Sequence, residues 1–128
     1  MILGVDLGQK TTGLAISEGT LASPYKTITH KSQKEAVEKI SAIIKELGAD
    51  TVVIGAVEGK IKTMFESFAK KLSTINYHLS TILWDETLTS RQARSAMIKL
   101  GISRKKRAEK EHEVAAALIL QSYLDSYD

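Results

Sequence analysis

The stretch GVDLGQKTTGLAIS, residues 4–17, places an aspartate inside an apolar pattern that is typical of β-structure. Two short apolar runs, MILGVDL and TTGLAIS, are separated by a tight Gly-Gln-Lys turn, which predicts a β-hairpin. A carboxylate within an apolar strand is costly to ionise unless it is paired or bound to a metal. Asp6 is therefore the first candidate for a functional residue, although an aspartate beside Gly8 more often simply closes a turn.

The composition of the chain excludes several classes of protein. Its 128 residues, 43% of them hydrophobic, are enough to bury a core, so we expect a single domain over residues 1–128. No run of about 18 apolar residues and no basic-then-apolar leader is present, which predicts a cytoplasmic protein. The absence of cysteine excludes disulfides, thiol nucleophiles and Cys-ligated zinc, so any metal must bind oxygen or histidine.

The first half of the chain predicts three strands, a helix and a further strand. The hairpin is followed by YKTITH (25–30), whose alternation of polar and apolar residues predicts a third, antiparallel strand. Helical spacing of apolar residues then begins after Ser32, which can act as the N-cap, and ends at Gly48. The continuous apolar run ADTVVIGA (49–56) predicts a strand buried on both faces.

The second half alternates helices with one more strand. Apolar spacing predicts helices over 65–75 and 90–100, a strand over 78–84, and a last helix over 110–123 that buries Val114, Ala117, Leu118 and Gln121. Strands that alternate with helices favour parallel pairing, whereas the opening hairpin requires antiparallel pairing. The fold class is therefore α/β, with a mixed sheet and helices packed on it.

Acidic residues stand at or near the ends of three predicted strands, namely Asp6, Glu58 and the pair Asp85-Glu86. Ligand sites of open α/β sheets lie at the carboxyl ends of their strands. We therefore predict that these acids converge on one edge and bind a hard divalent cation. Each also has an ordinary structural explanation, because Glu-Gly-Lys is a common solvated turn and the Asp-Glu pair can cap the next helix.

Three blocks of the sequence resemble the YqgF/RuvX family of ribonuclease-H-like nucleases. They are ILGVDLGQKTTGLAIS (2–17), LWDETLTSRQA (83–93), and the ending RKKR (104–107) with AAALILQSYLDS (115–126). The resemblance implies a five-stranded mixed sheet with its first three strands antiparallel and helices on both faces. It also implies phosphodiester hydrolysis with Mg²⁺ or Mn²⁺ in maturation of the 5′ end of pre-16S ribosomal RNA. An older assignment of the family, Holliday-junction resolvase acting on four-way DNA, is the alternative.

The resemblance extends to individual residues. The first aspartate of the family falls on Asp6, and its Asp-Glu-Arg-x-Thr block falls on residues 85–89, where Glu86 is kept and Thr87 replaces the arginine. The last acid of the family falls on His112, so an imidazole stands where a carboxylate is expected. Imidazole can bind Mn²⁺ or exchange a proton, but His112 can also be a plain solvated helix residue.

Other glutamates can compensate for that departure. Glu109 and Glu113 lie within a helical turn of His112, and Glu58 falls where RuvC-type resolvases carry a catalytic glutamate. The resemblance therefore implies the catalytic residues Asp6, Glu86, His112 and Glu58, and the metal ligands Asp6, Glu86, Glu109 and His112.

The positive charge of the chain predicts a nucleic-acid partner. The net charge is only +3, but six of the eighteen Lys and Arg residues lie within residues 99–110. Such a cluster can bind phosphates without reading sequence, or it can be a soluble surface loop. The predicted nucleic-acid contacts are Lys10, Lys60, Arg104, Lys105, Lys106 and Arg107.

Pre-rRNA is favoured over branched DNA as the substrate, and a monomer or weak homodimer is expected. A catalytically silent RNA-binding domain of ribosome assembly is the main rival from another class, and the histidine at position 112 favours it. An ATP-binding domain of the sugar-kinase type shares the opening hairpin but needs a far longer chain.

Overall fold

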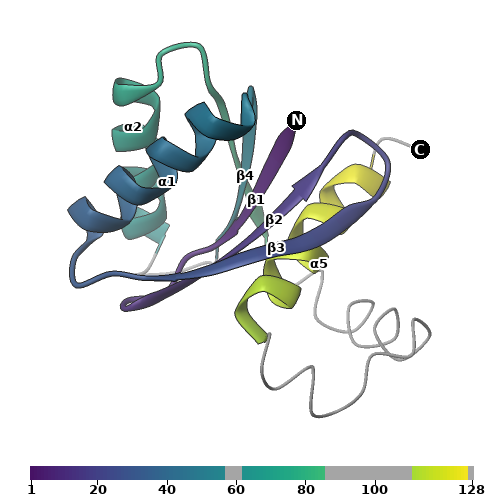
Figure 1. The fold of residues 1–128 in the computed structure, drawn as a ribbon, viewed down its shortest axis with the longest axis horizontal. Helices are drawn as coiled ribbons and strands as arrows, with labels where there is room; N and C mark the ends of the chain where they lie inside the picture. The colour runs from purple at the N-terminus through teal and green to yellow at the C-terminus, as the bar shows by residue number, and fades with distance from the viewer. Residues whose placement is uncertain (57–61, 86–110, 127–128) are drawn as a thin grey trace.

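The computed structural model describes residues 1–56, 62–85 and 111–126. These residues form a five-stranded sheet with helices on both faces (Figure 1). Among them, no helix has the length and apolar character needed to cross a membrane. The elements in chain order are β1 (Ile2–Asp6), β2 (Thr11–Ser17), β3 (Ala22–Thr29), α1 (Gln33–Leu47), β4 (Thr51–Ala56), α2 (Lys62–Ile75), β5 (Ser80–Asp85) and α5 (Glu111–Asp125).

The strand order β3-β2-β1-β4-β5 confirms the predicted mixed sheet. The pairs β1–β2 and β2–β3 are antiparallel, whereas the pairs β1–β4 and β4–β5 are parallel. The parallel strands therefore end at one edge, where Asp6 closes β1 and Asp85 closes β5. The predicted helix over 90–100 lies outside the described residues.

Strand β3 begins three residues earlier than predicted and includes Pro24. Proline cannot donate a ladder hydrogen bond, but β3 is an edge strand, where this loss is tolerated. The register also shifts between Leu14 and Ala15, which pair with Lys26 and Pro24, so Tyr25 is the extra residue. The predicted strand over 25–30, which starts after this proline, therefore began too late.

Helix α1 begins and ends where its capping residues predict. The Ser32 hydroxyl accepts a hydrogen bond from the Glu35 amide at 3.1 Å, and Gly48 adopts the left-handed conformation with φ 67°. Its apolar side packs on the sheet together with α2, around Ile40, Phe68 and Ile54. Figure 1 shows α1 and α2 on the face of the sheet opposite α5.

Strand β4 is buried on both faces, as the apolar run predicted. Val52 and Ile54 face α1 and α2, whereas Val53 packs in the cluster that α5 forms. Of the four residues predicted to share one face of α5, Val114 and Ala117 are buried, whereas Leu118 and Gln121 are only half-buried. Its fully buried residues are Val114, Ala116, Ala117, Ile119, Leu120 and Tyr123.

Candidate active site

Asp6 lies at the carboxyl edge of the sheet, on the face that α5 covers. Two residues earlier on β1, a Cβ atom at Gly4 would lie 2.8 Å from Leu120 of α5. Alternate residues of a strand share a face, so the Asp6 side chain also points to the α5 side. Asp6 is half-buried there.

The first turn of α5 rests on the neighbour of Asp6. Asp6 pairs with Gly13 of β2, and a Cβ atom at Gly13 would lie 1.8 Å from the carbonyl oxygen of His112 and 2.7 Å from the Glu113 nitrogen. Only a residue without a side chain leaves room for this backbone contact. The contact brings the start of α5 beside the strand end that carries Asp6.

Charges of α5 act directly on Asp6. Burial raises the pKa of the Asp6 carboxyl above 3.8, and the Glu111 charge raises it further, while the His112 charge opposes the increase. The side chains of Glu111 and His112 are exposed. Asp6 is thus a poorly hydrated carboxylate with a second carboxylate and an imidazole nearby.

Glu113 is directed to another strand. Its Oε2 atom accepts a hydrogen bond of 3.1 Å from the Thr27 hydroxyl on β3. Thr27 pairs with Gly13, so it is two strands away from Asp6, a distance of about 10 Å across the sheet. Of the two glutamates that flank His112, the one before it therefore influences Asp6.

Asp85 ends β5 on the opposite face from Asp6. The preceding residue, Trp84, faces α5: its indole nitrogen donates to Ser122 at 3.1 Å and its ring meets that of Tyr123 at 5.6 Å. Leu83 belongs instead to the core beneath α1 and α2, and strand alternation puts Asp85 on that same side. The two strand-end aspartates do not share one face.

The predicted site is described only in part. Asp6 and His112 are brought together, and Lys10 is exposed in the β1–β2 turn, where its carbonyl accepts a 2.9 Å hydrogen bond from the His30 amide. Glu58, Lys60, Glu86, Glu109 and the run Arg104, Lys105, Lys106 and Arg107 lie outside the described residues.

Asp6 and the start of α5 carry side chains of the kinds that bind divalent metal ions. Within 1–56, 62–85 and 111–126, no group of three His, Asp or Glu residues is close enough to hold an ion. The chemistry of the donors at Asp6, two carboxylates and an imidazole, nevertheless suits a divalent cation. Burial disfavours the charged form of the Asp6 carboxyl, and a nearby cation would favour it.

Sequence reasoning missed Glu111. Of the two glutamates that adjoin His112, Glu113 was the predicted candidate. The pattern of α5 alone could not separate the two glutamates, because the rotation of the helix about its axis depends on the contact with Gly13.

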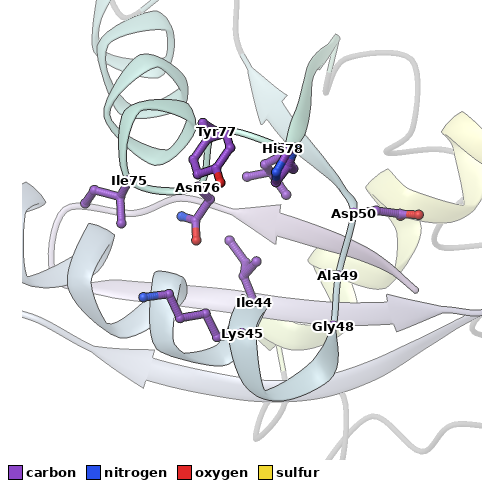
Figure 2. A pocket seen from close by; sticks show the side chains of 10 residues that line it. Ile44, Lys45, Gly48, Ala49, Asp50, Ile75, Asn76, Tyr77 and His78 are labelled. Atoms are coloured by element: carbon purple, nitrogen blue, oxygen red, sulfur yellow. The ribbon is translucent and has the colours of Figure 1, made fainter.

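A groove of about 350 Å³ lies at the other end of the sheet (Figure 2). It is lined by the end of α1, the end of α2 and the segment before β5, including Ile44, Ile75 and Tyr77. Asp50, which precedes β4, is its one acidic lining residue. Because it lies roughly 15 Å along the strands from the row of Asp6, this groove is separate from the candidate active site.

The sequence of the chain matches the model of a known protein family. The model of the family described as "RuvX: Holliday junction resolvase" matches residues 1–126. The chain belongs to the RuvX family. This confirms the resemblance read from the hairpin, the central block and the last helix.

Curated RuvX relatives span nearly the same length. One from Geobacillus thermodenitrificans is 40% identical over 134 residues, covering 97% of this chain and 96% of the relative. Another from Bacillus subtilis is 36% identical over 135 residues, covering 98% and 97%. Both are named "Putative pre-16S rRNA nuclease".

Solved structures share the fold of this RuvX chain. The fowlpox virus Holliday junction resolvase matches with a TM-score of 0.63 and 19% identity, over 99% of both chains. RuvC of T. thermophilus, in complex with a Holliday junction substrate, matches with a TM-score of 0.56 and 14% identity, over 98% of this chain and 94% of RuvC. At these identities the likeness concerns the fold alone.

Proposed function

We propose that this chain is a metal-dependent nuclease that hydrolyses phosphodiester bonds in the precursor of 16S rRNA, at its 5′ end, in the cytoplasm. The observation that carries the proposal is the desolvated Asp6 carboxylate beside Glu111 and His112 at the carboxyl edge of the sheet. A purely RNA-binding domain has no need of a carboxylate held at the cost of its hydration.

The residues of the site have distinct proposed roles. Asp6 offers carboxylate oxygens to a divalent ion, together with Glu86 and Glu109, and Glu58 completes the catalytic set. His112 offers a ring nitrogen, which can bind Mn²⁺ or take up a proton, and Glu111 supplies charge beside it. When bound, the Mg²⁺ or Mn²⁺ ion activates water and neutralises charge on the leaving oxygen.

Substrate binding is assigned to the basic residues. Lys10 is exposed in the turn that follows Asp6, so its ammonium group can meet a phosphate next to the one being cleaved. We assign the remaining backbone contacts to Lys60 and to the run 104–107, which together supply affinity without sequence readout.

Cleavage of four-way DNA is the second candidate. It is supported by the description of the matching family as Holliday junction resolvase and by the shared fold of two junction resolvases. The names of the curated relatives favour RNA.

A parallel cleavage assay separates these functions. A pre-16S RNA fragment and a synthetic four-way junction are each incubated with the protein and with Asp6→Asn, in Mg²⁺, Mn²⁺ or EDTA. We expect metal-dependent cleavage of the RNA that Asp6→Asn abolishes. Cleavage of the junction alone would assign the resolvase activity, and binding of RNA without cleavage, and without metal binding by calorimetry, would make this a silent RNA-binding domain.

A further inference from the structure

One row of paired residues crosses three strands beneath the start of α5. Asp6 of β1 pairs with Gly13 of β2, and Gly13 pairs with Thr27 of β3. The first turn of α5 spans this row, with the His112 carbonyl against Gly13 and the Glu113 carboxylate accepting from the Thr27 hydroxyl. In this row, Asp6 is a candidate catalytic acid, Gly13 leaves room for the helix backbone, and Thr27 hydrogen-bonds to the helix.

We propose that Thr27 and Glu113 are positioning residues, whose hydrogen bond fixes the first turn of α5 so that Glu111 and His112 stay beside Asp6. The proposal rests on the proposed nuclease function, because it assigns these two residues to the same site. Neither residue contacts the reacting atoms in this account. Both act through the helix turn that carries Glu111 and His112.

The first turn of α5 needs such an anchor. Glu111 and His112 are exposed, and the buried face of the helix begins only at Val114. First turns fray readily because their amide groups lack acceptors within the helix. Gly13 provides space but no side chain to hold the turn. A hydrogen bond from β3 to Glu113 supplies this restraint.

Replacement of Glu113 can distinguish the hydrogen bond to Thr27 from a role as metal ligand. A ligand must keep its negative charge, whereas an anchor needs only an oxygen that accepts the Thr27 hydroxyl. The amide oxygen of glutamine accepts that hydrogen bond without carrying a charge. Glu113→Gln and Glu113→Ala should therefore behave differently if Glu113 is an anchor, and alike if it is a ligand.

The experiment compares Thr27→Val, Thr27→Ser, Glu113→Ala and Glu113→Gln with a control, Thr29→Val. Thr29 lies two residues further along β3, on the same face and also exposed, so its replacement removes a comparable hydroxyl. Amide hydrogen exchange of residues 115–117, the first that donate within α5, is measured in metal-free protein. Cleavage is measured as kcat and KM.

Thr27→Val and Glu113→Ala should each speed exchange of these amides about three- to tenfold, the effect of one lost hydrogen bond. Each should lower kcat by a similar factor at unchanged KM, and the double variant should lose less than the sum of the two single variants. Thr27→Ser, Glu113→Gln and Thr29→Val should match the parent. The proposal is overturned if Thr27→Val exchanges like Thr29→Val, or if Glu113→Gln is as impaired as Glu113→Ala.

Hydrogen exchange keeps this test independent of the proposed function. If the parent cleaves nothing while the exchange pattern holds, the nuclease function fails and the anchor stands. If cleavage is normal in the parent and exchange is unaffected by Thr27→Val, the anchor fails and the nuclease function stands.

Discussion

Gly13 and His112 are in backbone contact: a Cβ atom on Gly13 would lie 1.8 Å from the His112 carbonyl oxygen. Since Gly13 also pairs with Asp6, this contact sets how closely the first turn of α5 approaches the candidate catalytic carboxylate. The lack of a side chain at one position therefore determines which charges surround Asp6.

Gly13→Ala should damage both stability and cleavage. The added methyl group meets rigid backbone, so we expect a loss of about 1–3 kcal/mol in urea unfolding and a loss of cleavage as α5 is displaced. Gly55→Ala is the comparison, because its Cβ would meet the Cδ1 atom of the Ile119 side chain, at 2.4 Å, instead of backbone. Equal effects of the two variants would show that the contact with His112 is unimportant.

Asp6→Asn should abolish cleavage without unfolding the protein. Loss of one anionic ligand should reduce the rate roughly 100-fold or more. Burial raises the pKa of Asp6 above 3.8, so the ionised form costs folding free energy at pH values above that point. In metal-free buffer at pH 7 the variant should be at least as stable as the parent, by urea unfolding. A variant that cleaves at the parent rate would disprove this placement of the site.

His112→Asp should raise cleavage in Mg²⁺ and narrow any advantage of Mn²⁺. Aspartate supplies the oxygen ligand that Mg²⁺ prefers, whereas neutral imidazole suits softer ions. Rates are compared across a titration of each ion.

Glu111→Gln tests the neighbour of His112 that the structure places near Asp6. This variant should lower cleavage, since it removes negative charge beside Asp6. If both variants cleave like the parent, the start of α5 has no part in the chemistry.

Replacement of Arg104, Lys105, Lys106 and Arg107 by alanine should weaken binding to nucleic acids of every sequence. With four phosphate contacts removed, the slope of log K against log salt should fall by roughly three units. Binding is measured at several salt concentrations by fluorescence anisotropy. An unchanged slope would mean that this run does not contact the backbone.

His30 should make the protein less stable in mild acid. Its side chain is only 4% exposed, Nε2 lies 2.7 Å from the Thr12 hydroxyl, and burial lowers the pKa of His30 below 6.5 despite the opposing charge of Glu35. Lys39 adds to the lowering. Because the unfolded state takes up this proton more readily, stability should fall as the pH drops below 6.5.

The matched variants for this pH dependence are His30→Gln and His78→Gln. Unfolding free energies between pH 7 and 5 should fall less steeply for His30→Gln than for the parent. His78→Gln is the control, because it removes a histidine whose side chain is exposed. A parent-like slope in His30→Gln would show that burial of His30 does not govern the acid response.

The sequence alone determined most of the sheet and the α1 helix. The signals for these elements are local. The turn residues of the hairpin, the caps Ser32 and Gly48, and the apolar run of β4 each determine the structure of a few neighbouring residues, so they can be recognised without knowing the fold. The family was also readable, because its blocks fall in order along the chain. The start of β3 was placed too late, since only the strand order shows that β3 is an edge strand, where Pro24 is tolerated.

Only the tertiary structure decided which residues of α5 face Asp6. In sequence, Glu111, His112 and Glu113 are adjacent and equally suited to replace a missing acid. Their directions depend on how the helix is rotated and how closely it approaches the sheet, and both are set by the contact with Gly13 and the hydrogen bond to Thr27. These partners lie about 85 to 100 positions earlier in the chain, so no local pattern in α5 records them, and the choice between neighbouring glutamates is made by long-range packing.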